Sequence, residues 1–170
     1  MHTMIKDYLL RPWKMDDVDN LIKYGSNPNI TRFMSDGFSQ LFTAEKAKAF
    51  IEFANTGNNK LYRTIDIGGE ASGGIGVMLQ PDIYCKNAEL GYWLAEPFWG
   101  QGIITGAIKQ IVEEAFQIFD INRVFAVPFS NNTASHRVLE KAGFKLEARH
   151  EKKVFKNGEF LDEWVYAIIR

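Results

Sequence analysis

Apolar and polar positions alternate along the first third of the chain in a way that predicts one strand and two helices. The segment YLLRPW (8–13) is typical of a first strand, and the acidic pair Asp16-Asp17 then suits a helix start. A second helix is expected after Thr43, which can cap it, and before Gly57-Asn58-Asn59, which ends it. The spacing of apolar residues supports both helices: Val18, Leu21 and Ile22 in the first, and Ala47, Phe50, Ile51 and Ala54 in the second.

The central third predicts three antiparallel strands. LYRTIDI (61–67) and IGVMLQ (75–80) flank the turn-forming stretch IGGEASGG, which makes a hairpin the natural interpretation. AELGYWLA (88–95) is also strand-like, and Pro97 follows it and stops regular pairing.

The last part alternates helix and strand and ends in a strand pair. RVFAV (123–127) has the apolar character of a buried parallel strand. Asn131 or Asn132 can cap the following helix, which Gly143 terminates, and two strands (145–155 and 160–169) surround the turn at 156–158. The helix before RVFAV shows one apolar side: Ile104, Ile108, Ile111, Val112, Ala115 and Phe119. The whole pattern predicts an α/β fold, a mixed sheet with helices on both faces.

Composition limits the classes of function. A chain of 170 residues that is 46% hydrophobic is expected to form a single domain, residues 1–170. A formal charge of -1 argues against a nucleic-acid partner. No apolar run approaches a membrane span and no signal-peptide core precedes the fold, so a cytoplasmic protein without a membrane partner is expected. Cys85 is the only cysteine, which excludes an internal disulfide and a multi-cysteine zinc site, and we expect no metal.

The stretch FWGQGIITGA (98–107) places three glycines between a strand and a helix. Such a turn exposes several backbone N–H groups without helical partners, which together with the helix dipole favour an anion such as a pyrophosphate. An ordinary tight turn, in which glycine accommodates a positive φ, explains the spacing equally well. A P-loop and a dinucleotide fingerprint are both excluded, because their lysine and acidic residues are missing.

GYWLAEPFWGQGIITGA (91–107) followed by NNTASHRVLEKAGF (131–144) closely resembles the GCN5-related N-acetyltransferases (GNAT), in particular the RimJ/RimL-like branch that acetylates the N-terminal amines of ribosomal proteins. LRPWKMDDVDNLIKY and NGEFLDEWVYAII are similar to the same branch, so the resemblance covers essentially the whole chain. It implies the GNAT fold, with about seven mostly antiparallel strands splayed between strands 4 and 5. It also implies an acetyl-CoA-dependent acyltransferase.

The resemblance further implies where acetyl-CoA binds. The pyrophosphate would lie on the amides from Gln101 to Thr105, the acetyl oxygen on the N–H near Leu94 or Ala95, and the pantetheine arm near Asn132. The coenzyme-binding residues implied in full are Trp93, Leu94, Ala95, Trp99, Gly100, Gln101, Gly102, Ile103, Ile104, Thr105, Asn132 and Ser135. Trp99 stands where the wider family has Gln or Arg, although this branch often has Trp or Arg there, and Ile104 replaces the usual Gly or Ala. Gly106 stands where the branch usually has Glu. The branched Ile104 side chain predicts weaker coenzyme binding.

Two residues are candidates for the acid and base chemistry. Ser135 matches the Asn-x-x-Ser pattern in which a serine resembles the partner of the leaving thiolate; the position of the tyrosine that many relatives use holds Leu139. A purely local role for Ser135 at the start of its helix stays open. Glu89 is the candidate base, acting through water, and a solvated strand carboxylate is the alternative. His136 is expected to be exposed, about 100° around the helix from Ser135.

The function predicted is transfer of acetyl from acetyl-CoA to a primary amine, by direct attack through a tetrahedral intermediate. The acceptor is a protein N-terminus or a small-molecule amine, and a homodimer is compatible with the family. A weak or inactive CoA-binding or sensing module is the alternative, on the grounds of Ile104, Gly106 and the unassigned base. The loops 27–42 and 81–87 are expected to shape the acceptor pocket, where the acidic Asp36, Asp82 and Glu96 would favour a cation.

Overall fold

The computed structural model describes residues 7–39 and 43–170. Its helices of one turn or more, in chain order, are α1 (Val18–Gly25), α2 (Pro28–Thr31), α3 (Asp36–Ser39), α4 (Ala44–Asn55), α5 (Ile103–Ile118) and α6 (Thr133–Lys141). Its strands are β1 (Leu9–Arg11), β2 (Lys60–Ile67), β3 (Glu70–Leu79), β4 (Asn87–Leu94), β5 (Arg123–Ala126), β6 (Lys145–Lys156) and β7 (Glu159–Ile169). Short 3-10 turns occupy Met15–Asp17, Asp82–Tyr84 and Glu96–Phe98.

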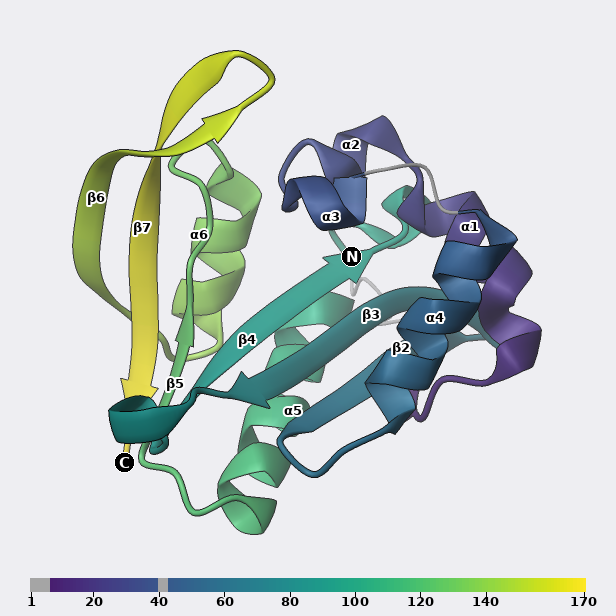
Figure 1. The fold of residues 1–170 in the computed structure, drawn as a ribbon, viewed down its shortest axis with the longest axis horizontal. Coiled ribbons are helices and arrows are strands. Elements are labelled where there is room, and N and C mark those ends of the chain that lie inside the picture. The colour runs from purple at the N-terminus through teal and green to yellow at the C-terminus, as the bar shows by residue number, and fades with distance from the viewer. Residues whose placement is uncertain (1–6, 40–42) are drawn as a thin grey trace, which may run out of the picture.

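The strands of the described residues form one sheet in the order β1-β2-β3-β4-β5-β7-β6 (Figure 1). The neighbouring strands pair antiparallel except for β4 and β5, which are parallel. The predicted mixed, mostly antiparallel α/β sheet is therefore confirmed.

β4 and β5 stay together over only three residue pairs, from Asn87↔Arg123 to Glu89↔Phe125. β4 continues to Leu94 and remains paired with β3 over that whole length. The two parallel strands therefore diverge beyond Glu89, as Figure 1 shows, and the predicted splay between strands 4 and 5 is confirmed.

Two apolar clusters cover the two faces of the sheet. The larger lies between the sheet and α5 and α6, and the smaller lies under α1 and α4, which cross the opposite face (Figure 1). Residues of β4 alternate between these clusters: Ala88, Leu90 and Leu94 belong to the first and Trp93 to the second. The predicted placement of helices on both faces is correct.

The β2–β3 hairpin differs from the prediction, which assigned residues 67–74 to a turn. The turn consists only of Gly68 and Gly69, both at positive φ, and β3 begins at Glu70. Gly73 and Gly74 of the stretch lie within the strand, where neighbouring atoms occupy the space that a side chain would need, and so does Gly76 beyond it. A Cβ at Gly74 would lie 2.6 Å from the Trp93 indole nitrogen, and one at Gly76 would lie 1.6 Å from the Tyr62 ring.

Candidate active site

The glycine turn after β4 presents a row of free backbone donors. Gly100 and Gly102 adopt φ values of 73° and 76°, which are strained for residues with a side chain. The first helical hydrogen bond of α5 runs from Gly106 N to Gly102 O, at 3.1 Å. Within residues 7–39 and 43–170, the N–H groups from Gly100 to Thr105 have no acceptor. These amides and the positive end of the α5 dipole form a site for an anion.

The departures at Ile104 and Gly106 each have a place in the packing. Ile104 is partly buried against the cluster under α5, so its branched side chain is held by the core. A Cβ at Gly106 would lie 2.6 Å from the Tyr8 hydroxyl, so glycine lets Tyr8 approach the first turn of α5.

The second free donor lies on β4 itself. Ala95 N donates to Ser72 O at 2.8 Å, and Asn87 O accepts from Gln80 N at 2.9 Å, so the odd-numbered residues of β4 bond to β3. By alternation, the backbone groups of Leu94 point the other way, into the space from which β5 has diverged. The Leu94 carbonyl is occupied there by the Trp99 indole, whose Nε1 donates to it at 2.7 Å.

The first turn of α6 lies across this gap from β4. Asn132 caps the helix by accepting a hydrogen bond from Ser135 N at 3.3 Å. Of the two predicted caps, Asn131 and Asn132, the second is therefore the one used. The Ser135 hydroxyl is buried and is hydrogen-bonded to the Tyr92 hydroxyl of β4. Sequence reasoning missed Tyr92; the signal was a polar hydroxyl on the strand face that otherwise carries Ala88, Leu90 and Leu94.

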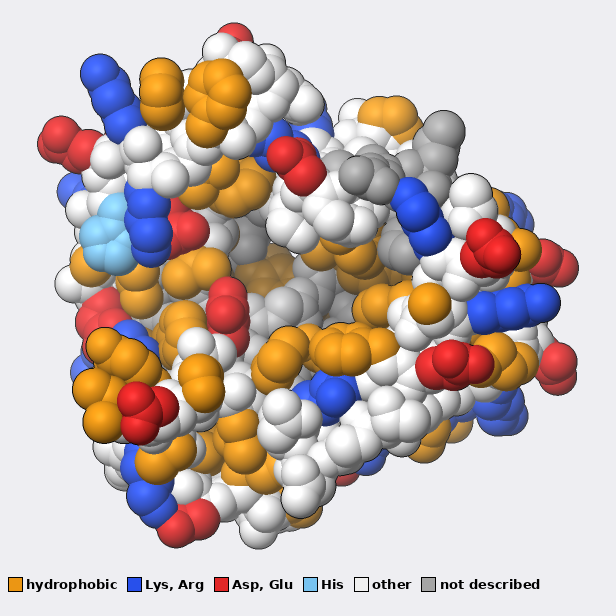
Figure 2. All heavy atoms as spheres, viewed as in Figure 1, with side chains coloured by type: hydrophobic (Ala, Val, Ile, Leu, Met, Phe, Trp, Pro, Cys, Tyr) orange, Lys and Arg blue, Asp and Glu red, His pale blue; other side chains and the backbone are white. Residues whose placement is uncertain are grey.

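The opposite face of β4 carries Glu89. Burial raises the pKa of the Glu89 carboxyl, the nearby Glu163 raises it further, and Lys153 opposes the shift. The pKa of the Tyr62 hydroxyl is raised mainly by burial and, to a smaller extent, by the negative charge of Glu89. The molecule is hollowed near the centre of this face (Figure 2). Glu89 and Ser135 thus lie on opposite faces of one strand.

Trp93 is not with the other predicted coenzyme residues. Its ring is 6% exposed on the Glu89 side of β4 and packs against Phe38, with ring centroids 6.0 Å apart. The structure brings together Leu94, Trp99, the turn 100–105, Asn132 and Ser135, whereas the Trp93 side chain borders the other face.

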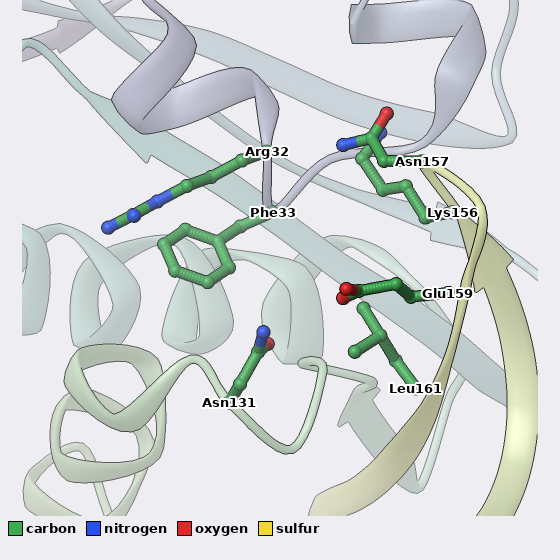
Figure 3. Close-up of a pocket in the computed structure, with 7 residues that line it drawn as sticks. All are labelled: Arg32, Phe33, Asn131, Lys156, Asn157, Glu159 and Leu161. Carbon is green, nitrogen blue, oxygen red and sulfur yellow. The ribbon is translucent and has the colours of Figure 1, made fainter.

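A pocket of about 250 Å³ opens between α2, the turn before α6 and the β6–β7 hairpin (Figure 3). Arg32 and Asn131 line it together with Lys156, Asn157 and Glu159 of the hairpin. Its lining therefore mixes guanidinium, ammonium, amide and carboxylate groups.

Two expectations about the surroundings of the site are wrong, and part of a third lies outside the described residues. His136 is buried, 7% exposed, because α6 packs on β7 and holds the imidazole between Trp164 and Tyr166; its Nε2 lies 3.0 Å from Ser130 O. The loop 81–87 leads into the start of β4, so it lies at the paired end of that strand and away from the glycine turn. Residues 40–42 of the other loop lie outside the described residues.

The three acidic residues named as a cation site do not form one. Asp36 is paired with Lys156 at 3.1 Å, and Glu96 accepts hydrogen bonds from Asn27 and Asn29. Asp82 belongs to the turn before β4, at the far end of that strand.

The described residues, 7–39 and 43–170, lack two further features. In that part of the chain no three His, Cys, Asp or Glu side chains are grouped as metal ligands would be. Over the same residues no helix has the length and hydropathy needed to cross a membrane.

Comparison with known proteins decides the family. The family model described as an acetyltransferase (GNAT) domain matches residues 7–145. The chain belongs to the GNAT acetyltransferase family. The predicted acyltransferase is thereby confirmed, with acetyl-CoA as the cosubstrate of this family.

Individual relatives of this GNAT protein agree with the family. The chain is 28% identical over 170 residues to YnaD, an uncharacterised N-acetyltransferase of Bacillus subtilis (strain 168). The aligned region covers 99% of this chain and 97% of that relative. It is 34% identical over 84 residues to the ribosomal-protein-serine acetyltransferase of Escherichia coli (strain K12), or 49% of this chain and 47% of that protein. The structure of RimL, a ribosomal L7/L12 alpha-N-protein acetyltransferase in complex with coenzyme A, superposes with a TM-score of 0.85 at 23% identity over 95% of this chain and 93% of that chain.

Proposed function

We propose that this protein transfers acetyl from acetyl-CoA to a primary amine by direct attack, with the α-amine of a peptide as the acceptor that the site suits best. The observation that carries this proposal is the row of unpaired amides at Gly100–Thr105 beside the strand gap that exposes the Leu94 amide. The first group of donors suits a diphosphate, and the single inward donor suits a carbonyl oxygen that gains charge during acyl transfer.

The Leu94 N–H is the donor that we assign to the acetyl oxygen. Of the two amides considered, that of Ala95 is already bonded to Ser72 O. β3 is paired with β4 on both sides of this amide, at Trp93 and, through the Ala95 N–H, at Ser72 O, so the donor is held before substrate binds. A donor that needs no reorganisation lowers the barrier most effectively.

Glu89 is the base that we assign, from the face of β4 opposite the coenzyme. Its raised pKa makes the carboxylate a better proton acceptor than an exposed glutamate, and a water can connect it to the amine. A peptide α-amine has a reference pKa of about 7.7–8.0 and needs far less help than a lysine-like amine at about 10.4. A single half-buried carboxylate such as Glu89 is therefore a strong enough base for an α-amine.

The lining of the acceptor side supports a peptide over a polyamine. A polyamine is held best by several carboxylates without a cationic partner, and Asp36 is already paired with Lys156. The pocket in Figure 3 instead offers Arg32, Asn131 and Asn157, whose N–H groups can donate to peptide carbonyls.

The activity is tested by following free thiol while the protein is incubated with acetyl-CoA and amines. Peptides with free amino termini, the same peptides with blocked termini, and polyamines form the panel. Thiol release with free-terminus peptides alone is the expected result. Coenzyme binding in a calorimetric titration without thiol release on any amine would favour a CoA-binding module, and no binding at all would refute the site.

Ser135→Ala tests the assignment of the hydroxyl that faces the leaving sulfur. We expect turnover to fall by about tenfold or more, with coenzyme affinity changed much less, because one hydrogen bond to a charged group is worth about 1.5–3 kcal/mol. Thr133→Ala is the matched control, since Thr133 is exposed in the same helical turn. Equal turnover in the two variants would leave Ser135 with a structural role only.

A further inference from the structure

The Tyr92 hydroxyl is a buried polar group that the chemistry above leaves without a use. Tyr92 lies on β4 between Leu90 and Leu94, on the face that packs against α5 and α6. Across the strand gap its hydroxyl is hydrogen-bonded to the Ser135 hydroxyl on the first turn of α6. In the described part of the chain this is the only hydrogen bond of either hydroxyl.

The direction of that hydrogen bond follows from what each hydroxyl can do. Both groups are able to donate, but a phenol is the more acidic of the two. When Tyr92 donates to the Ser135 oxygen, the Ser135 proton is left to point elsewhere, and no acceptor among the described residues takes it. A serine at this place in the helix would otherwise be expected to bond to the backbone of its own turn.

Burial raises the pKa of Tyr92 to about 12, an effect larger than that of the hydrogen bond shared with Ser135, which lowers the pKa. The phenol therefore keeps its proton throughout the range in which an amine acceptor is neutral. It can serve as a permanent donor to Ser135 but does not itself supply the proton that a thiolate takes up.

We propose that Tyr92 is a positioning residue for the leaving thiolate: it donates to Ser135 and so directs the Ser135 proton at the coenzyme sulfur. This inference rests on the proposed function, because it requires the sulfur to lie in the gap between β4 and α6. A hydroxyl that accepts one hydrogen bond becomes a stronger donor of the next. Tyr92 and Ser135 therefore stabilise the thiolate jointly.

The thiol pKa of coenzyme A in the complex measures this stabilisation without any acceptor. Bound coenzyme A is titrated by the ultraviolet absorbance of its thiolate, in the wild type and in Tyr92→Phe, Ser135→Ala and the double variant. We expect the wild type to lower the thiol pKa by about one unit from about 8.5, and Tyr92→Phe to raise it again by about half a unit. In the Ser135→Ala background, Tyr92→Phe is expected to change nothing further.

Tyr166→Phe is the matched control. Tyr166 belongs to the same cluster and is the more buried of the two tyrosines, but its hydroxyl donates to Glu140 at 3.4 Å. It should leave the thiol pKa unchanged, and thermal melts of all variants confirm that each is folded. The phenylalanine in Tyr92→Phe keeps the ring that packs on α5 and α6, so little loss of stability is expected.

The outcomes separate the two proposals. Failure of wild-type protein to bind coenzyme A overturns the proposed function itself. Binding with an unshifted thiol pKa, or a thiol pKa that responds to Ser135→Ala and not to Tyr92→Phe, overturns the role of Tyr92 alone. Equal shifts from Tyr92→Phe with and without Ser135 would show that Tyr92 acts independently of Ser135 and would also overturn it.

Discussion

Gly76 and Gly91 are partners in the β3–β4 ladder, yet they should respond in opposite ways to the same substitution. An ideal Cβ at Gly76 would lie 1.6 Å from Cδ1, 2.3 Å from Cε1 and 2.8 Å from Cγ of Tyr62. No small adjustment relieves three such contacts, so Gly76→Ala must expel the Tyr62 ring or separate β2 from β3. A Cβ at Gly91 meets no heavy atom within 4 Å.

The sizes of the two effects follow from these contacts. Overpacking of this kind costs about 1–3 kcal/mol, whereas alanine at an unstrained glycine position gains about 0.4–1 kcal/mol from the unfolded chain. Gly76→Ala should therefore be about 1.4–4 kcal/mol less stable than Gly91→Ala. For a chain of this size each 1 kcal/mol shifts the melting temperature by about 2–4 °C, so the two variants should melt roughly 3–16 °C apart.

Urea unfolding and thermal melts of the two variants measure the difference. Tyr62→Ala provides the control: once the ring is absent, Gly76→Ala should cost less than about 1 kcal/mol. Equal stability of Gly76→Ala and Gly91→Ala would refute the reasoning. Gly91→Ala has a functional consequence as well, because its methyl group stands on the Glu89 face of β4; we expect it to raise the KM for the acceptor and to leave coenzyme affinity unchanged.

Two further predictions concern charge and the anion site. The folded-state pKa of Glu89 is raised, chiefly by burial, so ionised Glu89 lowers stability at neutral pH. Glu89→Gln should therefore melt higher than the wild type at pH 7, and the difference should vanish as the pH falls through the folded pKa to below the unfolded value of about 4.3. Turnover with a free-terminus peptide should fall by about 100-fold. Melting curves over a pH series with parallel thiol assays check both parts, and a constant difference in melting temperature would contradict the first. Gly102→Ala should fold, because a Cβ at Gly102 meets nothing within 4 Å. The φ of 76° costs a residue with a side chain about 1–2 kcal/mol, so the variant should bind coenzyme about tenfold more weakly in calorimetry. Gly37→Ala is the control and should leave coenzyme binding unchanged.

The strand and helix pattern was largely predictable because apolar periodicity survives in each segment. The prediction of a turn over residues 67–74 was wrong for a tertiary reason: Gly73 and Gly74 are strand residues, and the missing side chain of Gly74 makes room for Trp93. Glycine usually marks a turn, and the sequence around 67–74 contains nothing that identifies the rings that will press against it. The prediction that His136 is exposed was wrong for a related reason, because its burial depends on β7, some 30 residues later in the chain.

Part of the candidate site was predictable and part was not. The glycine turn and the Asn132 cap are local features, so residue spacing alone places their donors. The link between Tyr92 and Ser135 joins residues 43 apart, and it exists only because β4 and α6 meet across the place where β5 diverges. Local patterns contain no information about that meeting.

The alternation of β4 explains how a single strand can serve every part of the proposed reaction. Even-numbered side chains point to α5 and α6, which places Tyr92 with Ser135; the odd-numbered Glu89 points to the opposite face. The Leu94 amide lies between the two faces, in the plane of the sheet, where it can be reached only because β5 has turned away. If β4 and β5 stayed paired to Leu94, that donor would be consumed by a ladder hydrogen bond, and the faces carrying Glu89 and Ser135 would be separated by closed sheet. In the proposed reaction the splay is therefore the feature that would let Glu89 on one face take a proton from the amine while Ser135 on the other face stabilises the leaving thiolate.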